Sequence, residues 1–255
     1  MAYTIAFAGK GGTGKTSLAG LTIKYLVSKR RKPVLGVDAD SNSCLNEALG
    51  VAVCNTVGRM REESLNTIKS GADRPGGMSM EQLFDYEVQQ SVIEAKGFDL
   101  LVMGRPEGTG CYCAANNIIR KYTDKLSETY SYVVIDNEAG MEHLSRRTTH
   151  KVDLLITVSD PTMKGILTAK RINELVDELK LSVEKRALII NRVVSGEGEE
   201  LKKEAEKAGL FVAGLVPNDG MIYEFDLKGK PVYELPEDAV SVKALYKILD
   251  DCCIP

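Results

Sequence analysis

The stretch Gly9-Lys10-Gly11-Gly12-Thr13-Gly14-Lys15-Thr16 decides the fold of this 255-residue chain. It follows the apolar run Tyr3–Ala8 and precedes a stretch from Leu18 to Val27 in which apolar residues recur at helical spacing. A G-x-x-x-x-G-K-[ST] segment between a strand and a helix is typical of a phosphate-binding loop. Its glycines let several backbone N–H groups point inward at an anion, and the positive end of the following helix adds to the attraction.

Each residue type in the loop has a chemical role. The Lys15 ammonium is placed to bridge the β- and γ-phosphates of a nucleotide, and the Thr16 hydroxyl is a ligand for Mg²⁺. An ordinary glycine-rich turn would not need the Lys-Thr ending. The residues that we expect to bind the nucleotide in this segment are Gly9, Lys10, Gly11, Gly12, Thr13, Gly14, Lys15, Thr16 and Ser17.

Further apolar runs, each too short for a helix, alternate with stretches of helical spacing. This alternation predicts an α/β fold with a mostly parallel sheet of about seven or eight strands and helices on both faces. The expected strands are Tyr3–Ala8, Pro33–Val37, Leu100–Met103, Tyr132–Ile135, Leu154–Val158, Ala187–Ile190 and Phe211–Val216. The expected helices include Leu18–Val27, Ile166–Leu179, Leu201–Ala208 and a closing helix from Val240 to Leu249.

No repeat or low-complexity linker divides the chain, so residues 1–255 are expected to form a single domain. Residues 55–97 are less periodic and contain Pro75-Gly76-Gly77 followed by a polar helical stretch around Glu81–Glu94. We interpret this segment as a surface insertion with a role in partner binding. Binding residues are expected in the loops at the carboxyl edge of the sheet.

Composition restricts the partners. The chain carries 33 basic and 36 acidic residues, interspersed, with a net charge of −3. No basic field is present for nucleic acid or an anionic membrane, so neither is an expected partner. No leader and no apolar stretch of about 18 residues is evident, which predicts a cytoplasmic protein. In that compartment the six cysteines are expected to be thiols or metal ligands.

Gly-Lys-Gly-Gly-Thr-Gly-Lys-Thr resembles the deviant Walker A motif of the MinD and nitrogenase iron protein family, and further segments follow the family's order over nearly the whole chain. The resemblance implies a P-loop ATPase that works as a homodimer. It also implies that Lys10, which sits too early in the loop to reach its own γ-phosphate easily, crosses the dimer interface. Catalytic roles then fall to Lys10, Lys15 and Asp40.

Two acidic segments resemble the switches of that family. Val37-Asp38-Ala39-Asp40-Ser41-Asn42 is similar to the first switch, which implies that Asp38 serves the Mg²⁺ outer shell and Asp40 positions the attacking water. The alternative is that both residues only cap a helix start. Tyr132–Gly140 resembles a Walker B strand and second switch, so that Asp136 holds Mg²⁺ through water and the Gly140 amide senses the γ-phosphate. Asn137 and Glu138, which follow the aspartate, depart from the common Asp-x-x-x-Gly sequence of that switch in the family.

Two later segments concern the base. Ile189-Ile190-Asn191-Arg192 resembles the base-reading corner of the family, and Pro217-Asn218-Asp219 resembles its second base loop. The implied base-site residues are Asn191, Pro217 and Asp219. A GTPase would show Asn-Lys-x-Asp, whereas position 194 is Val194, so ATP is favoured over GTP.

Cys111 and Cys113 lie in a loop after the strand Leu100–Met103, on the same sheet edge as the phosphate loop. Side chains at i and i+2 of an extended segment point to the same side, and two thiolates supply half of a four-ligand site for zinc, another soft divalent metal or an iron–sulfur cluster. A two-fold axis near these loops would complete a Cys₄ site from two chains. Small packed thiols are the alternative. Adjacent Cys252 and Cys253 are expected to lie at a frayed end without function.

The Cys-Tyr-Cys pair and Asp-Asn-Glu-Ala-Gly together resemble the accessory ATPases that assist nickel insertion into carbon monoxide dehydrogenase. That resemblance implies a nickel or zinc ion held between subunits and carbon monoxide dehydrogenase as partner. An electron-transfer ATPase with an iron–sulfur cluster is one alternative, although residues 136–148 contain no cysteine. A Min- or Par-type positioning ATPase is another, although Val240–Pro255 lacks a periodic basic face.

Overall fold

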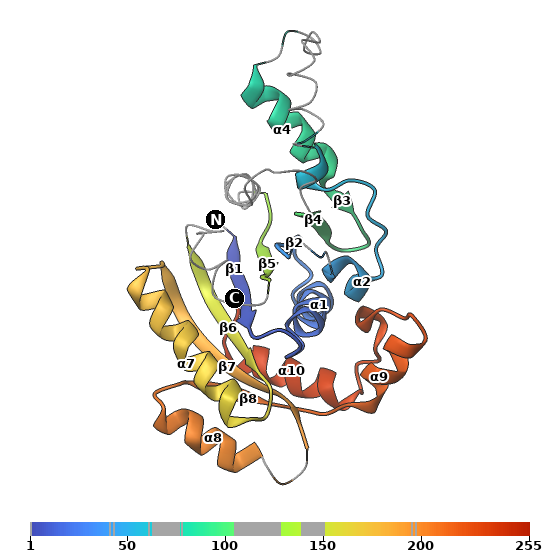
Figure 1. Ribbon diagram of the computed structural model, residues 1–255. Helices are drawn as coiled ribbons and strands as arrows, with labels where there is room; N and C mark the ends of the chain where they lie inside the picture. The colour runs from blue at the N-terminus through green and yellow to red at the C-terminus, as the bar shows by residue number, and fades with distance from the viewer. Residues whose placement is uncertain are drawn as a thin grey trace.

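The structure is a computed structural model that describes residues 2–40, 42, 44–60, 62, 77, 79–104, 129–138, 151–194, 196 and 198–255. It contains an eight-stranded sheet in the order β3-β4-β2-β5-β1-β6-β7-β8 (Figure 1). All described neighbours pair in parallel except β3 and β4. The strands are β1 Tyr3–Gly9, β2 Val34–Asp38, β3 Ile93–Glu94, β4 Asp99–Val102, β5 Tyr132–Asp136, β6 Val152–Ser159, β7 Val183–Val193 and β8 Val212–Pro217.

Helices cover both faces of the sheet, which confirms the predicted α/β architecture. On one face α1 contacts β1 and β5, and α10 contacts β8; on the other, α7 contacts β6 and β1, and α8 contacts β7 and β8. The helices are α1 Lys15–Tyr25 with its π-helical continuation η1 Leu26–Arg30, α2 Leu45–Leu49, α4 Met80–Ser91, α7 Met163–Glu178, α8 Gly198–Lys207, α9 Gly220–Leu227, the 3₁₀ turn η3 Val232–Glu234 and α10 Val240–Asp251.

The sheet has a hydrophobic core on each face, because successive side chains of a strand point to opposite faces. In β1, Ile5 and Phe7 point into the core beneath α1 and α10, whereas Ala6 and Ala8 point into the core beneath α7. Because every residue of such a strand is buried on one face or the other, the sequence shows a continuous apolar run rather than an alternating one. This explains why the expected strands were all found close to their predicted positions.

Among the described residues, the short elements β3, α2 and α9 and the 3₁₀ turn η3 were not predicted. α2 spans Leu45–Leu49 and β3 only Ile93–Glu94, so neither is long enough to show a period in the sequence. α9 is short and apolar on several sides, with Ile222 and Phe225 only partly buried against the core, so its sequence shows no single apolar stripe like those of the other helices.

The helix α4 projects away from the sheet (Figure 1). It begins with a capping box in which the Ser79 hydroxyl accepts the N–H of Gln82 and the Gln82 side chain accepts the N–H of Ser79. The helical stretch predicted around Glu81–Glu94 therefore exists, although it ends at Ser91 and gives way to β3. Much of the predicted insertion at 55–97 lies outside the described residues.

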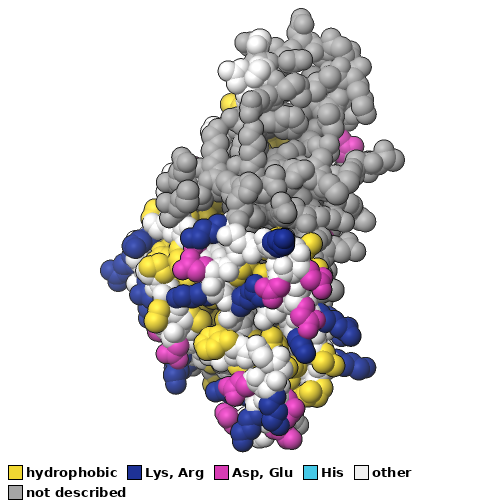
Figure 2. All heavy atoms as spheres, turned by 90° about the vertical axis from the view of Figure 1, so that its left-hand side faces the viewer, with side chains coloured by type: hydrophobic (Ala, Val, Ile, Leu, Met, Phe, Trp, Pro, Cys, Tyr) yellow, Lys and Arg dark blue, Asp and Glu magenta, His cyan; other side chains and the backbone are white. Residues whose placement is uncertain are grey.

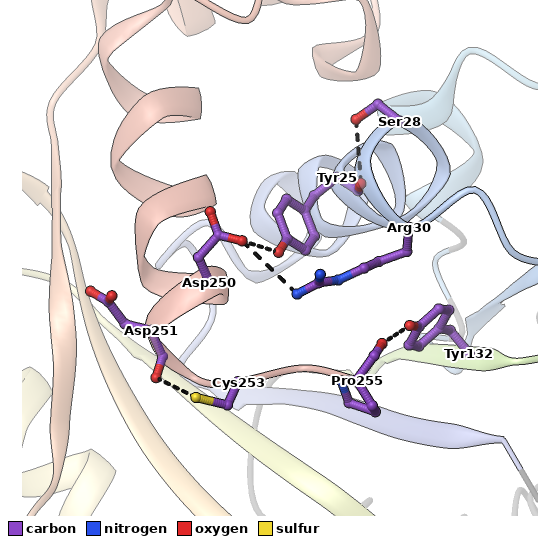
Figure 3. A network of polar contacts seen from close by, with 8 residues as sticks. All are labelled: Tyr25, Ser28, Arg30, Tyr132, Asp250, Asp251, Cys253 and Pro255. Atoms are coloured by element: carbon purple, nitrogen blue, oxygen red, sulfur yellow. Dashed lines mark hydrogen bonds and ion pairs between the residues drawn. The ribbon is translucent and has the colours of Figure 1, made fainter.

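The carboxyl-terminal tail is seated on the body of the protein, which corrects the expectation of a frayed end (Figure 3). The Asp250 carboxylate accepts the Tyr25 hydroxyl and lies 3.9 Å from the Arg30 guanidinium. The Tyr132 hydroxyl donates to the Pro255 carbonyl oxygen. Ile254 is 2% exposed within the core beneath α1 and α10, so apolar burial holds the tail in place.

Charged side chains of both signs are interspersed on the face that carries α7 and α8 (Figure 2). Among the described residues, no helix combines the length and the apolarity that a membrane span requires.

Candidate nucleotide-binding site

The phosphate loop connects β1 to α1 at the carboxyl edge of the sheet, where the sequence placed it. Gly9, Gly12 and Gly14 have positive φ of 148°, 79° and 90°. A Cβ on Gly9 would lie 2.3 Å from the Val158 carbonyl oxygen, and one on Gly14 would lie 2.4 Å from the Asn191 amide nitrogen. Glycine is therefore required at both positions by the backbone and by the close neighbours.

The loop is closed by bonds to one of its own carbonyls. The Thr13 hydroxyl and the Lys15 ammonium donate to the Lys10 carbonyl oxygen at 2.9 and 3.3 Å. Lys15 is 7% exposed. Burial lowers the pKa of this lysine, and the carboxylates of Asp136 and Asp40 oppose the shift. A buried ammonium beside the loop is a preformed partner for an anion.

Lys10 lies apart from this arrangement. Its side chain is exposed, and it makes neither an ion pair nor a side-chain hydrogen bond with the other described residues. It is free to reach away from its own loop.

Thr16 and Asp136 lie in contact at the end of β5. The Thr16 hydroxyl donates to Asp136 Oδ2 at 2.6 Å, and Asp136 is 1% exposed. Its second oxygen, Oδ1, is buried without a hydrogen-bond partner among the described residues. Burial raises the Asp136 pKa to about 6, against the opposing effects of the Thr16 hydrogen bond and Lys15. An unsatisfied buried carboxylate oxygen is costly unless a cation or water pairs with it.

Asp38 lies opposite Asp136 in the β2–β5 register. Its two oxygens accept the backbone N–H groups of Asp40 and Leu45 at 3.1 and 2.9 Å, so it holds the start of α2. Burial raises the Asp38 pKa to about 7, and the Leu45 hydrogen bond opposes this shift. Asp40 accepts the N–H of Asn42 at 2.8 Å. Both acidic residues thus make the local turn and capping bonds that were the alternative interpretation of this segment.

Asn137, which departs from the sequence of the resembled family, ties the segment after β5 to β1. Its side-chain amide donates to the Phe7 carbonyl oxygen at 2.8 Å, and the residue is 3% exposed. Asn137 therefore fixes the chain directly after Asp136 against the strand that leads into the phosphate loop.

The end of β7 also touches the phosphate loop. The Asn191 amide donates to the Thr13 carbonyl oxygen at 2.8 Å, and the Arg192 guanidinium donates to the Gly12 carbonyl oxygen at 2.9 Å. Sequence reasoning assigned Asn191 to the base and gave Arg192 no role. The Arg192 contact had no signal in the sequence, because it joins residues 180 positions apart.

A cavity of about 840 Å³ lies beside the loop rather than over Lys15. Its wall includes Gly14, Thr16 and Ser17 from the loop and α1, Asn191 and Pro217 from the sheet edge, and residues of α2 and α9 that were not predicted. This volume is within the range of small-molecule sites. Its position, next to the phosphate loop and at the ends of β7 and β8, suits the base and ribose of a nucleotide.

Asp219 lines this cavity, but its carboxylate is engaged by two helices. Oδ1 accepts the Met221 N–H of α9 at 3.0 Å, and Oδ2 accepts the N–H and hydroxyl of Ser241 in α10 at 3.1 and 2.7 Å. Burial raises the Asp219 pKa, whereas these hydrogen bonds to Ser241 and Met221 lower it, and the net direction is down. Asp219 joins the two helices at the wall of the cavity.

Three predicted site residues lie outside the described residues, namely Gly140, Cys111 and Cys113. Within the described ranges, no three side chains from His, Cys, Asp and Glu gather as candidate metal ligands.

A phosphate loop, a Thr–Asp pair at its base and a cavity at the carboxyl edge of a parallel sheet define a P-loop nucleotide-binding protein. The chain belongs to the CobQ/CobB/MinD/ParA nucleotide-binding domain family, CbiA, which matches residues 4–232. It is an ATP-binding member of the MinD/ParA-type ATPases.

Curated relatives cover the chain almost from end to end. An uncharacterized ATP-binding protein of Methanocaldococcus jannaschii is 44% identical over 246 residues, which are 96% of each chain. The carbon monoxide dehydrogenase accessory protein CooC of Rhodospirillum rubrum is 29% identical over 246 residues, which are 91% of this chain and 89% of that protein.

Solved structures share the fold. A ParA family ATPase from Chlorobium tepidum has a TM-score of 0.73 at 18% identity, covering 97% of this chain and 98% of that one. The septum site-determining protein MinD of Pyrococcus horikoshii, solved with Mg-ADP, has a TM-score of 0.68 at 18% identity, covering 99% of this chain and 96% of that one.

Proposed function

We propose that this protein hydrolyses MgATP as a homodimer and carries a nickel or zinc ion between its subunits for insertion into carbon monoxide dehydrogenase. The observation that supports the ATPase part best is the contact between Thr16 and Asp136. It joins the end of the phosphate loop to a buried carboxylate whose Oδ1 has no partner among the described residues.

The donor set fits Mg²⁺. A hydroxyl and two carboxylates from Thr16, Asp136 and Asp38 are hard oxygen ligands of the kind that Mg²⁺ takes, directly or through water. When bound, Mg²⁺ would neutralise charge on the β- and γ-phosphates. A cation there would also partner Asp136 Oδ1 and offset the cost of two buried carboxylates in neighbouring strands.

Residues of the chain itself bind the phosphates and orient the attacking water. The loop N–H groups and Lys15 bind the phosphates, and Asp40 orients the attacking water. Lys10, whose exposed side chain has no partner among the described residues, reaches the phosphates bound by the second subunit. Such a contact in trans makes hydrolysis depend on dimerisation.

The metal-carrying part rests on the Cys111 and Cys113 pair together with the 29% identity to CooC of Rhodospirillum rubrum. Two thiolates leave the shell of a soft divalent ion half filled, and a two-fold axis would supply the other two. In this proposal the nickel or zinc ion is cargo, and carbon monoxide dehydrogenase is the recipient.

The test is a metal titration by equilibrium dialysis at several protein concentrations, with and without a non-hydrolysable ATP analogue. We expect about one ion per two chains, with tighter binding in the presence of the analogue, because both ligands favour the closed dimer. Cys111→Ser and Cys113→Ser are expected to lose the metal and keep the nucleotide. Cys253→Ser, an exposed thiol at the tail, is the matched control. One ion per chain, unaffected by the analogue, would overturn the shared site.

The same preparation separates the alternatives. An iron–sulfur protein purified without oxygen would show a brown chromophore, whereas a zinc or nickel dithiolate pair would not show the cluster spectrum. A membrane-positioning role would need a free amphipathic face at the carboxyl end. In α10 the apolar side chains Val242, Leu245 and Leu249 are fully buried in the core, which argues against that use of the helix.

A further inference from the structure

Two consecutive residues at the end of β7 bind two consecutive carbonyls of the phosphate loop. Asn191 Nδ2 lies 2.8 Å from the Thr13 carbonyl oxygen, and Arg192 Nη1 lies 2.9 Å from the Gly12 carbonyl oxygen. Asn191 is 5% exposed and Thr13 is 2% exposed, so the first of these bonds is shielded from water. We call this pair of contacts the loop brace.

The loop brace acts on the side of the loop that faces away from an anion. For successive N–H groups to converge on phosphates, the carbonyls of the same peptides have to point elsewhere. A carbonyl turned into a protein wall needs a donor there, because an unpaired buried carbonyl is destabilising. Asn191 supplies that donor for the buried Thr13 carbonyl. Arg192 adds a second, exposed hydrogen bond to the neighbouring Gly12 carbonyl.

The backbone of β7 is irregular at this place. Between the register pairs Ile190–Leu215 and Val193–Pro217, β7 advances by three residues while β8 advances by two, which is a β-bulge. Arg192 lies in the bulge with φ at +60°, a left-handed conformation that is unfavourable for arginine. Bulges of this kind redirect a side chain beside a functional site. Here the bulge directs Asn191 and Arg192 at the loop.

We propose that Asn191 and Arg192 are positioning residues that hold the phosphate loop in its binding conformation before nucleotide arrives. The inference rests on the proposed ATPase function and deepens it. The energetic role is preorganisation, since a loop already held in its bound shape loses less conformational freedom on binding. The close packing of Asn191 on Gly14 shows how tightly the two segments fit.

Arg192→Gly tests the loop brace without removing the fold. Glycine accepts a positive φ, so the substitution relieves the backbone while it deletes the guanidinium. Lys180→Gly is the matched control, because Lys180 has φ at +51° and lies at the end of α7, away from the cavity. Both variants are expected to keep the wild-type unfolding temperature to within about 3 °C.

The readouts are MgADP affinity by calorimetry and hydrogen exchange of peptides covering residues 10–16 in nucleotide-free protein. For Arg192→Gly we expect roughly three- to tenfold weaker binding, a moderate loss because the guanidinium is exposed, and faster exchange in the loop. Lys180→Gly should match wild type in both. Arg192→Lys, which keeps one donor, should recover part of the affinity.

Wild-type affinity and wild-type loop exchange in Arg192→Gly would overturn the loop brace. The proposed function fails by a different result, namely that the wild-type protein binds MgADP but neither hydrolyses MgATP nor binds nickel or zinc. In that case the exchange of residues 10–16 in the nucleotide-free variants still decides whether Arg192 holds the loop.

Discussion

At the scale of single residues, the site is dominated by two buried carboxylates on neighbouring strands. Asp38 and Asp136 face each other in the register of β2 and β5, and both are essentially inaccessible to water. Burial of an acid without a paired cation favours its neutral form. The ionised forms of these two carboxylates therefore destabilise the fold unless a cation is bound between them. This property is expected of a site for a divalent cation.

This arrangement gives a pH dependence with a defined sign. The folded-state pKa of Asp38, about 7, lies above its ordinary value of 3.8, so the folded protein binds more protons than the unfolded chain between these values. Stability without metal should fall as pH rises through that window. Asp38→Asn should therefore gain stability relative to wild type between pH 5 and pH 8, by a few kcal/mol at about 1.4 kcal/mol per pKa unit.

Urea unfolding in EDTA at several pH values measures the effect. Asp177→Asn is the control, because the hydrogen bond from Arg186 lowers the Asp177 pKa and places its titration below the window. A stability difference between Asp38→Asn and wild type that is the same at pH 5 and pH 8 would contradict the prediction.

At the scale of elements, the carboxyl and amino ends of the parallel strands are occupied by different parts of the chain. The carboxyl edge carries the loops of the site, whereas the amino edge is closed by the tail that follows α10. Ile254 fills the core there, and the Tyr132 hydroxyl binds the last described carbonyl (Figure 3). Since α10 also contacts α1, the tail supports the helix that begins at the phosphate loop.

Ile254→Ala tests this closure. Removing a buried isoleucine side chain costs roughly 2–5 kcal/mol, and the lower end is expected near a chain end that can relax. The neighbouring substitution Cys253→Ser affects an exposed side chain and should change stability by less than about 0.5 kcal/mol. Chemical denaturation of both variants gives the comparison, and equal stabilities would show that the tail is not part of the folded core.

At the scale of the whole molecule, the proposed homodimer gives the two loop lysines different roles. Lys15 is buried in its own loop, whereas Lys10 is exposed at the surface. Lys15→Ala is therefore expected to abolish nucleotide binding. Lys10→Ala should bind MgATP nearly as well as wild type and lose ATP-induced dimerisation, with hydrolysis slower by about 10³–10⁵, as for other charges supplied in trans.

Mixing two inactive chains tests the assignment directly. In a heterodimer of Lys10→Ala with Asp40→Ala, the site of the first chain keeps its own Asp40 and receives Lys10 from the second. Activity should return in the mixture if Lys10 acts in trans. If it acts within its own chain, both sites stay defective and the mixture remains inactive. Light scattering of each variant with MgATP reports dimerisation separately from turnover.

Much of this fold could be predicted from the sequence because its signals are local. A buried parallel strand is a short apolar run, and a phosphate loop needs glycines and a lysine at fixed spacing. The seven expected strands and the closing helix were confirmed on this basis. The position of Asp38 and Asp136 at one edge also followed, because parallel strands bring their carboxyl ends together. The metal role of Cys111 and Cys113 remains a prediction, since both lie outside the described residues.

Only the tertiary structure decided the contacts between segments that are far apart in the chain. Asn191 and Thr13 are 178 positions apart, and their bond depends on the bulge that directs the end of β7 at the loop. The engagement of Asp219 by Ser241 and the burial of Ile254 depend on where α10 packs. Composition and periodicity along the chain determine which residues form strands and helices, but they contain no distance between elements. Those distances are set by side-chain packing across the sheet, where each contact depends on all its neighbours.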